Sequence, residues 1–131
     1  MKLAMKKSIE SLAMKYKLKL ILLFGSRAGT DFDSESDYDI ALYADDVLDE
    51  KTLLDITAIL SEFLKSERVD VVDIKKAPPL LKKKIFENYR ILYEIDPTLK
   101  YQLELTGEYE FQEAEDLYIM RRERLGEALN D

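Results

Sequence analysis

The stretch "LLFGSRAGTDFDSESDYDIALY", residues 22–43, joins two apolar segments through a turn that is crowded with acidic side chains. The first apolar segment ends at Gly25, and carboxylates stand at positions 31, 33, 35, 37 and 39. Asp37 and Asp39 lead directly into the apolar run "IALY". Burial disfavours the charged form of a carboxylate, and neighbouring carboxylates repel each other. The pair at the mouth of this strand therefore needs a positive partner.

The spacing of Asp37 and Asp39 predicts that both side chains lie on one face of a strand, because side chains alternate between faces. Their positions are then roughly 6.5 Å apart along the chain. Ala41 shares their face, and the intervening side chains point toward the presumed core, namely Tyr38, Ile40 and Leu42. A divalent cation relieves the repulsion, and Mg²⁺ usually takes one or two carboxylates together with substrate phosphates and water.

A third carboxylate is expected from the segment "RVDVVDI", residues 68–74. Asp70 and Asp73 are three positions apart, so they face opposite sides of a strand and only one can join the pair. We expect Asp70, at the same end of the sheet, and keep Asp73 as the alternative. Three carboxylates from two strands are typical of a two-metal site for phosphoryl or nucleotidyl transfer. The simpler interpretation, solvated acidic residues at strand ends, is common for any single Asp.

The dipeptide Gly25-Ser26 follows an apolar strand and precedes a predicted helical turn. Glycine lets the backbone approach a ligand closely, and helix-start N–H groups with a hydroxyl suit phosphate oxygens. A Gly-Ser dipeptide is more often only a turn, and the chain has neither the P-loop motif nor GxGxxG. The phosphate interpretation therefore depends on the carboxylates that follow.

Composition limits the functional classes. The 131 residues suggest one domain, residues 1–131, and no apolar stretch is long enough for a transmembrane span. The N-terminal segment is interrupted by Lys, Ser and Glu, which is typical of an amphipathic helix and not of a signal peptide. The absence of cysteine excludes disulfides and thiolate metal sites. We expect a cytoplasmic protein with no membrane association.

Histidine is also absent, which excludes Ser-His-Asp hydrolysis and HExxH zinc chemistry. The net charge of −7 argues against direct nucleic-acid binding, because phosphates are repelled overall. The 36% charged content with few amide side chains is typical of a thermophilic source.

The hydrophobic pattern predicts the order helix, strand, strand, helix, strand, helix, strand, helix, with helices covering a small mixed sheet. The strands are expected at residues 18–25, 37–43, 68–74 and 90–95, and a short helix follows Pro78 and Pro79. Asp96-Pro97 is expected to break the chain before a charged C-terminal helix, about residues 98–131.

Gly25-Ser26, ten intervening residues and Asp37-x-Asp39 form the pattern GSx₁₀DxD, and a later Asp follows in "VDVVDI". Over about residues 5–95 this resembles the minimal nucleotidyltransferase (MNT) family of the polymerase-beta-like superfamily. The resemblance implies an α/β (α+β) nucleotidyltransferase fold, a short mixed sheet flanked by helices. It implies that Gly25 and Ser26 hold the phosphates of ATP. Asp37 and Asp39 would ligate two Mg²⁺ ions, and Asp70 would bind one and help deprotonate the attacking hydroxyl.

The short length narrows the resemblance. Poly(A) polymerases, CCA-adding enzymes and aminoglycoside nucleotidyltransferases carry extra domains for the acceptor, whereas only about 35 residues follow the core here. The chain resembles the MntA-type antitoxins encoded beside an all-helical HEPN toxin. This implies transfer of AMP from ATP to a tyrosine of that toxin, with release of pyrophosphate. Neutralisation by binding alone, and transfer to a small molecule or an RNA end, stay open, as do a homo-oligomer and a hetero-oligomer.

One departure from the family concerns the loop. Members often read "GSRARG", whereas this chain reads "GSRAGT", so a second arginine is missing and Asp31, Asp33 and Glu35 add negative charge. Arg27 remains, either as a phosphate ligand or as a structural residue.

Two further patterns lie outside the motif. The "KKK" at 82–84 is expected to be a solvated helix face. The C-terminal helix carries an apolar stripe, either for a protein partner or for the protein's own core, at Phe111, Ala114, Leu117, Tyr118, Leu125 and Leu129.

Overall fold

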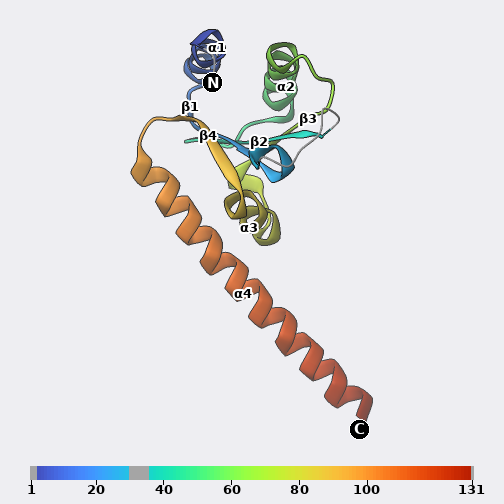
Figure 1. Cartoon of the computed structure of the whole chain (residues 1–131). Coiled ribbons are helices and arrows are strands. Elements are labelled where there is room, and N and C mark those ends of the chain that lie inside the picture. The colour runs from blue at the N-terminus through green and yellow to red at the C-terminus, as the bar shows by residue number, and fades with distance from the viewer. Residues whose placement is uncertain (1–2, 30–35, 131) are drawn as a thin grey trace.

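The computed structural model describes residues 3–29 and 36–130, with side chains described as far as residue 126. The acidic positions 31, 33 and 35 and the side chain of Leu129 lie outside this part. The elements follow the predicted order (Figure 1): α1 (Leu3–Tyr16), β1 (Leu18–Phe24), β2 (Tyr38–Ala44), α2 (Glu50–Leu64), β3 (Val69–Asp73), α3 (Pro79–Glu87), β4 (Tyr89–Glu94) and α4 (Pro97–Asn130). Short 3₁₀ turns follow β1 (Gly25–Ala28) and β3 (Ile74–Lys76).

The four strands form one mixed sheet in the order β3-β2-β1-β4. β1 pairs antiparallel with both β2 and β4, whereas β2 and β3 are parallel. The predicted α/β architecture, a short mixed sheet flanked by helices with a C-terminal helix, is therefore confirmed. The parallel pair follows from α2, which carries the chain back to the starting end of the sheet before β3 begins.

Helices cover both faces of the sheet, so the protein has two cores (Figure 1). α1 and α2 pack on one face over Ile21, Ile40 and Leu42, and α3 with the start of α4 covers the other. Ala41, which shares the face of Asp39, is fully buried in the second core. The second core explains why β1 is apolar at nearly every position, since a central strand buried on both faces has no polar side.

The predicted break at Asp96-Pro97 separates β4 from α4, and the same two residues start the helix, one residue earlier than the sequence predicts. The Asp96 carboxylate accepts a hydrogen bond from the Thr98 backbone N–H at 2.9 Å. Pro97 occupies the first helical position, where its missing N–H costs nothing because that group has no intrahelical partner. The combination of a capping Asp and a first-position Pro is a helix start signal.

The two halves of α4 have different surroundings. The first half packs on α3, where Lys82 Nζ forms an ion pair with Glu110 Oε2 at 2.7 Å. From residue 112 to residue 125 every side chain is exposed, and Figure 1 shows the helix extending away from the sheet. The apolar stripe at residues 114, 117, 118 and 125 is therefore not packed on the protein's own core. None of the helices in residues 3–29 and 36–130 is long and apolar enough to cross a membrane.

Candidate functional site

The sheet register places Asp39 beside Asp70. The two residues are Cα partners in the parallel pair of β2 and β3. Their neighbours Ala41 and Val72 pack in the core under α3, which places both carboxylates on that face of the sheet. Asp37 is exposed and lies immediately before β2. The structure thus places Asp70 beside Asp39, one member of the predicted pair.

Asp73 lies on the opposite face of the sheet from Asp70, and its carboxylate accepts hydrogen bonds from the backbone. Its side chain is 4% exposed and accepts hydrogen bonds from the Leu48 and Lys75 backbone N–H groups, both at 3.0 Å. A buried carboxylate with two such donors is a structural cap. Asp73, the alternative for the third carboxylate, therefore does not join Asp39 and Asp70.

Gly25 makes room for Asp39 at the end of β1. Its φ is +76°, a conformation that side-chain-bearing residues rarely adopt, and an added Cβ would lie 2.7 Å from Asp39 Oδ2. The backbone N–H of Gly25 donates to the Asn88 carbonyl at 3.2 Å, and Asn88 Nδ2 donates to the Gly25 carbonyl at 3.2 Å. Asn88 thus holds the turn. Sequence reasoning missed this residue, because nothing local connects position 88 with position 25.

Four of the five predicted site residues line one cavity of about 440 Å³. Gly25 and Ser26 line it from the first 3₁₀ turn, Asp39 and Asp70 from the sheet, and Lys84 from α3. Apolar side chains complete the wall, namely Phe24, Val71, Val72 and Leu81. Asp37 does not line the cavity. A hydroxyl, a glycine turn, two adjacent carboxylates and one ammonium group are thus directed at one space.

Asp39 lies partly buried among other carboxylates. Its pKa is raised above the ordinary value, first by burial and then by the negative charges of Asp70 and Asp37. The positive charge of Lys84 acts in the opposite direction and lowers this pKa. A metal ion bound between the carboxylates would remove the repulsion.

The donor set fits Mg²⁺, which takes oxygen ligands and usually only one or two carboxylates alongside phosphates and water. Asp39 and Asp70 supply that number on adjacent strands, and the charge of Asp37 reaches Asp39. Among the described residues, no group of three or more acidic side chains is gathered closely enough to hold an ion by itself. Two carboxylates leave the other coordination positions of such an ion to phosphate and water oxygens.

Arg27 holds the segment that leads to the carboxylates. Its Nε donates to the Ser36 carbonyl at 2.8 Å and its Nη1 to the Tyr38 hydroxyl at 2.9 Å. Its guanidinium also lies 3.9 Å from the centre of the Tyr38 ring. These contacts support a structural role for Arg27 over phosphate binding, because they occupy guanidinium N–H groups with which an arginine binds a phosphate.

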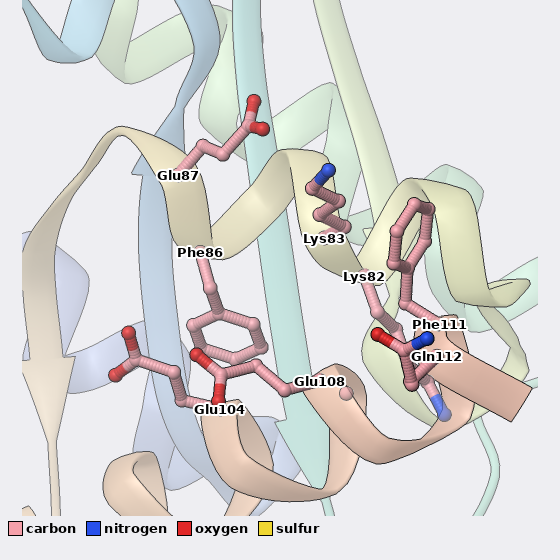
Figure 2. Close-up of a pocket in the computed structure, with 9 residues that line it drawn as sticks. Lys82, Lys83, Phe86, Glu87, Glu104, Glu108, Phe111 and Gln112 are labelled. Carbon is pink, nitrogen blue, oxygen red and sulfur yellow. The ribbon is translucent and has the colours of Figure 1, made fainter. Parts of the chain in front are cut away.

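A second hollow of about 420 Å³ lies between α3 and α4 (Figure 2). Charged side chains of both signs surround Phe86 and Phe111, among them Lys82, Glu104 and Glu108. None of the predicted site residues lines this hollow.

Comparison with known proteins identifies one matching family and several solved structures of similar fold. The family model for polymerase beta, nucleotidyltransferase, matches residues 6–98. No curated protein matches the chain. A solved toxin–antitoxin structure with AMP-PNP contains a chain that is 25% identical, with a TM-score of 0.76, and the match covers 95% of this chain and 98% of that one.

Two other solved structures share the fold. A tri-AMPylated Shewanella oneidensis HEPN toxin in complex with its MNT antitoxin contains a chain with a TM-score of 0.71 and 24% identity, covering 98% of this chain and 99% of that one. A putative minimal nucleotidyltransferase gives a TM-score of 0.56 and 21% identity, covering 66% of this chain and 88% of that one. Because the family model spans more than half of the sequence, the chain belongs to the polymerase beta nucleotidyltransferase family.

Proposed function

We propose that this protein is a Mg²⁺-dependent adenylyltransferase that transfers AMP from ATP to a tyrosine hydroxyl of a HEPN-type toxin, and thereby acts as an antitoxin. The observation that carries the proposal is the adjacency of Asp39 and Asp70 in the cavity that also contains Gly25 and Ser26. The family membership and the structural likeness to a toxin–antitoxin complex with AMP-PNP support the same conclusion. We further propose that residues 1–131 act as one domain.

Each site residue has a role in this proposal. Gly25 and Ser26 bind the phosphates through backbone N–H groups and the Ser26 hydroxyl. Asp37, Asp39 and Asp70 would hold two Mg²⁺ ions, whose chemistry would be to neutralise phosphate charge and to acidify the attacking hydroxyl. Asp70 also accepts the proton of that hydroxyl. The hydroxyl oxygen bonds to the α-phosphorus while the bond from this phosphorus to the bridging oxygen breaks, and pyrophosphate leaves.

The acceptor is proposed to be a protein because α4 offers a surface for one. Its exposed second half carries Leu117, Tyr118, Met120 and Leu125, each at least half exposed. A surface helix of this kind is typical of helix-mediated recognition.

The direct test is incubation with labelled ATP, Mg²⁺ and the candidate toxin, followed by peptide mapping. We expect label on a tyrosine of the toxin, and none with Asp37→Asn/Asp39→Asn. Asp55→Asn, an exposed change on α2, is the matched control and should leave labelling unchanged. Equal labelling by wild type and the double variant would contradict the catalytic assignment.

The second candidate function is neutralisation of the toxin by contact alone. The projecting half of α4 favours it, since that surface provides binding without chemistry. Toxin assays without ATP separate the two functions. If Asp37→Asn/Asp39→Asn neutralises the toxin as well as wild type, contact is sufficient.

A further inference from the structure

Three consecutive lysines of α3 have three different environments. Lys82 is largely covered, with a side chain only 14% exposed, and is paired with Glu110 of α4. Lys83 Nζ lies 4.1 Å from the centre of the Phe111 ring, also of α4. Lys84 instead lines the cavity that contains Ser26, Asp39 and Asp70. The expectation of one solvated lysine face is therefore wrong for Lys82, whereas Lys83 and Lys84 are exposed.

Lys84 supplies the positive charge of this cavity. It is the one cation among the nine described residues that line the cavity, and its charge acts on Asp39. The two ion pairs found among the described residues involve Lys19 and Lys82, so Lys84 is committed to neither. Lys84 is an exposed residue, so its ammonium group is able to bind an anionic ligand.

The other cation close to the turn is directed elsewhere. Arg27 is hydrogen-bonded to Ser36 and Tyr38 and stacks on the Tyr38 ring. A nucleoside triphosphate carries more negative charge than a glycine turn and one hydroxyl can balance. In the cavity, Lys84 is the side chain with the chemistry for the remaining phosphates, because an ammonium group is a compact partner for phosphate oxygens.

We propose that Lys84 binds the β- and γ-phosphates of ATP, the part that leaves as pyrophosphate. This inference rests on the proposed function and adds a residue to it. Lys84 makes no covalent bond in this step. Its charge stabilises the negative charge that develops on the departing pyrophosphate, which is the general effect of a positioned cation at a leaving group.

The test compares ligand binding by calorimetry for wild type, Lys84→Ala, Lys84→Gln, Lys84→Arg and the matched control Lys83→Ala. AMP-PNP with Mg²⁺ probes all three phosphates, and AMP probes the nucleoside and α-phosphate alone. We expect Lys84→Ala and Lys84→Gln to weaken AMP-PNP binding about tenfold, a typical effect for a charge-assisted contact. AMP binding should stay within about twofold, Lys84→Arg should restore most of the affinity, and Lys83→Ala should match wild type.

Two results would overturn the inference: a Lys84→Ala protein that binds AMP-PNP like Lys83→Ala, or one that loses AMP and AMP-PNP affinity equally. The proposed function fails separately. If wild type binds AMP-PNP in a Lys84-dependent way but transfers no AMP to the toxin, the phosphate assignment stands and the transfer reaction is wrong. If wild type binds no AMP-PNP, both proposals are wrong.

Discussion

At the residue scale, Gly25 and Asp39 depend on each other. The positive φ of Gly25 turns the chain at the end of β1, and its missing Cβ leaves space for the Asp39 carboxylate. The motif pairs these two residues across thirteen intervening positions, and the register of β1 with β2 brings Phe24 opposite Asp39. The glycine is thus part of the carboxylate site and not only of a phosphate turn.

Gly25→Ala is therefore expected to be costly. A Cβ at 2.7 Å from Asp39 Oδ2 must displace that carboxylate, and the φ of +76° adds about 1–2 kcal/mol of strain. We expect a lower melting temperature and loss of AMP transfer. Gly29→Ala is the matched control, since its added Cβ would meet Asn88 Nδ2 at an ordinary 3.6 Å. Equal effects of the two substitutions would show that Gly25 has no special contact.

Asp39→Asn should stabilise the metal-free protein while abolishing transfer. The pKa of Asp39 is raised in the folded state, so the folded protein holds this proton more tightly than the unfolded chain does. The charged form therefore costs stability above that pKa, and the cost disappears as the pH falls through it toward the ordinary value of 3.8. Because Asp39 is partly exposed, we expect only several tenths of a kcal/mol at pH 7.

The measurement is urea unfolding in EDTA at a series of pH values between 7 and 4. Asp39→Asn should exceed wild type at pH 7 and converge with it at the acidic end. Asp55→Asn, on the exposed surface of α2, should show no such advantage. A variant less stable than wild type at pH 7 would mean that Asp39 is stabilised by its surroundings.

At the scale of elements, α4 combines an anchored half with a projecting one. A helix segment without tertiary contacts is marginal in water, because helix stability in proteins comes mostly from packing. The projecting half carries apolar side chains that nothing in the described part of the chain covers. The segment therefore has the properties of a surface that is completed by a partner.

Leu117→Glu/Leu125→Glu should weaken binding of the toxin partner. Each leucine that loses a buried contact forfeits about 1.5–3 kcal/mol, so the pair should reduce affinity at least tenfold. Affinity for AMP-PNP should not change, because the cavity lies at the sheet. Glu113→Gln, on the same stretch of helix, serves as the control. Calorimetry with the purified toxin and with AMP-PNP measures the two affinities for each variant. Unchanged toxin affinity of the double leucine variant would exclude this surface from the interface.

At the scale of the whole molecule, ligand binding should raise the free energy of unfolding. The cavity draws residues from the first 3₁₀ turn, β2, β3 and α3, so a bound nucleotide ties together elements that are far apart in the chain. A ligand that binds only the folded state stabilises it by mass action. The sheet and the helix that covers it should respond as one unit.

ATP with Mg²⁺ at about 100 times its dissociation constant should raise the free energy of unfolding by about 2.7 kcal/mol. EDTA should abolish the increase, and Asp39→Asn/Asp70→Asn should not show it. Thermal unfolding monitored by circular dichroism is sufficient. The same increase with ATP in EDTA would contradict the role of the carboxylates in holding a metal ion.

The sequence by itself determined the order of the elements and the character of the site. Apolar periodicity predicts each strand and helix, and the GSx₁₀DxD spacing places a turn and two carboxylates at one end of a sheet. These features are local, because they depend on side-chain alternation and on turn chemistry within some twenty residues. The same locality explains why the bounds of most elements agree with the prediction.

Only the tertiary structure decided which distant residues join the site. Asp70 and Asp73 are both aspartates of the same short strand. The register of β3 against β2 decides that Asp70 lies beside Asp39. Asn88 reaches Gly25 through the pairing of β4 with β1, and Lys84 separates from Lys82 and Lys83 because α4 covers one side of α3. Local sequence patterns do not describe contacts between elements that are far apart in the chain. The packing of the sheet and helices therefore decides which distant residues reach the site.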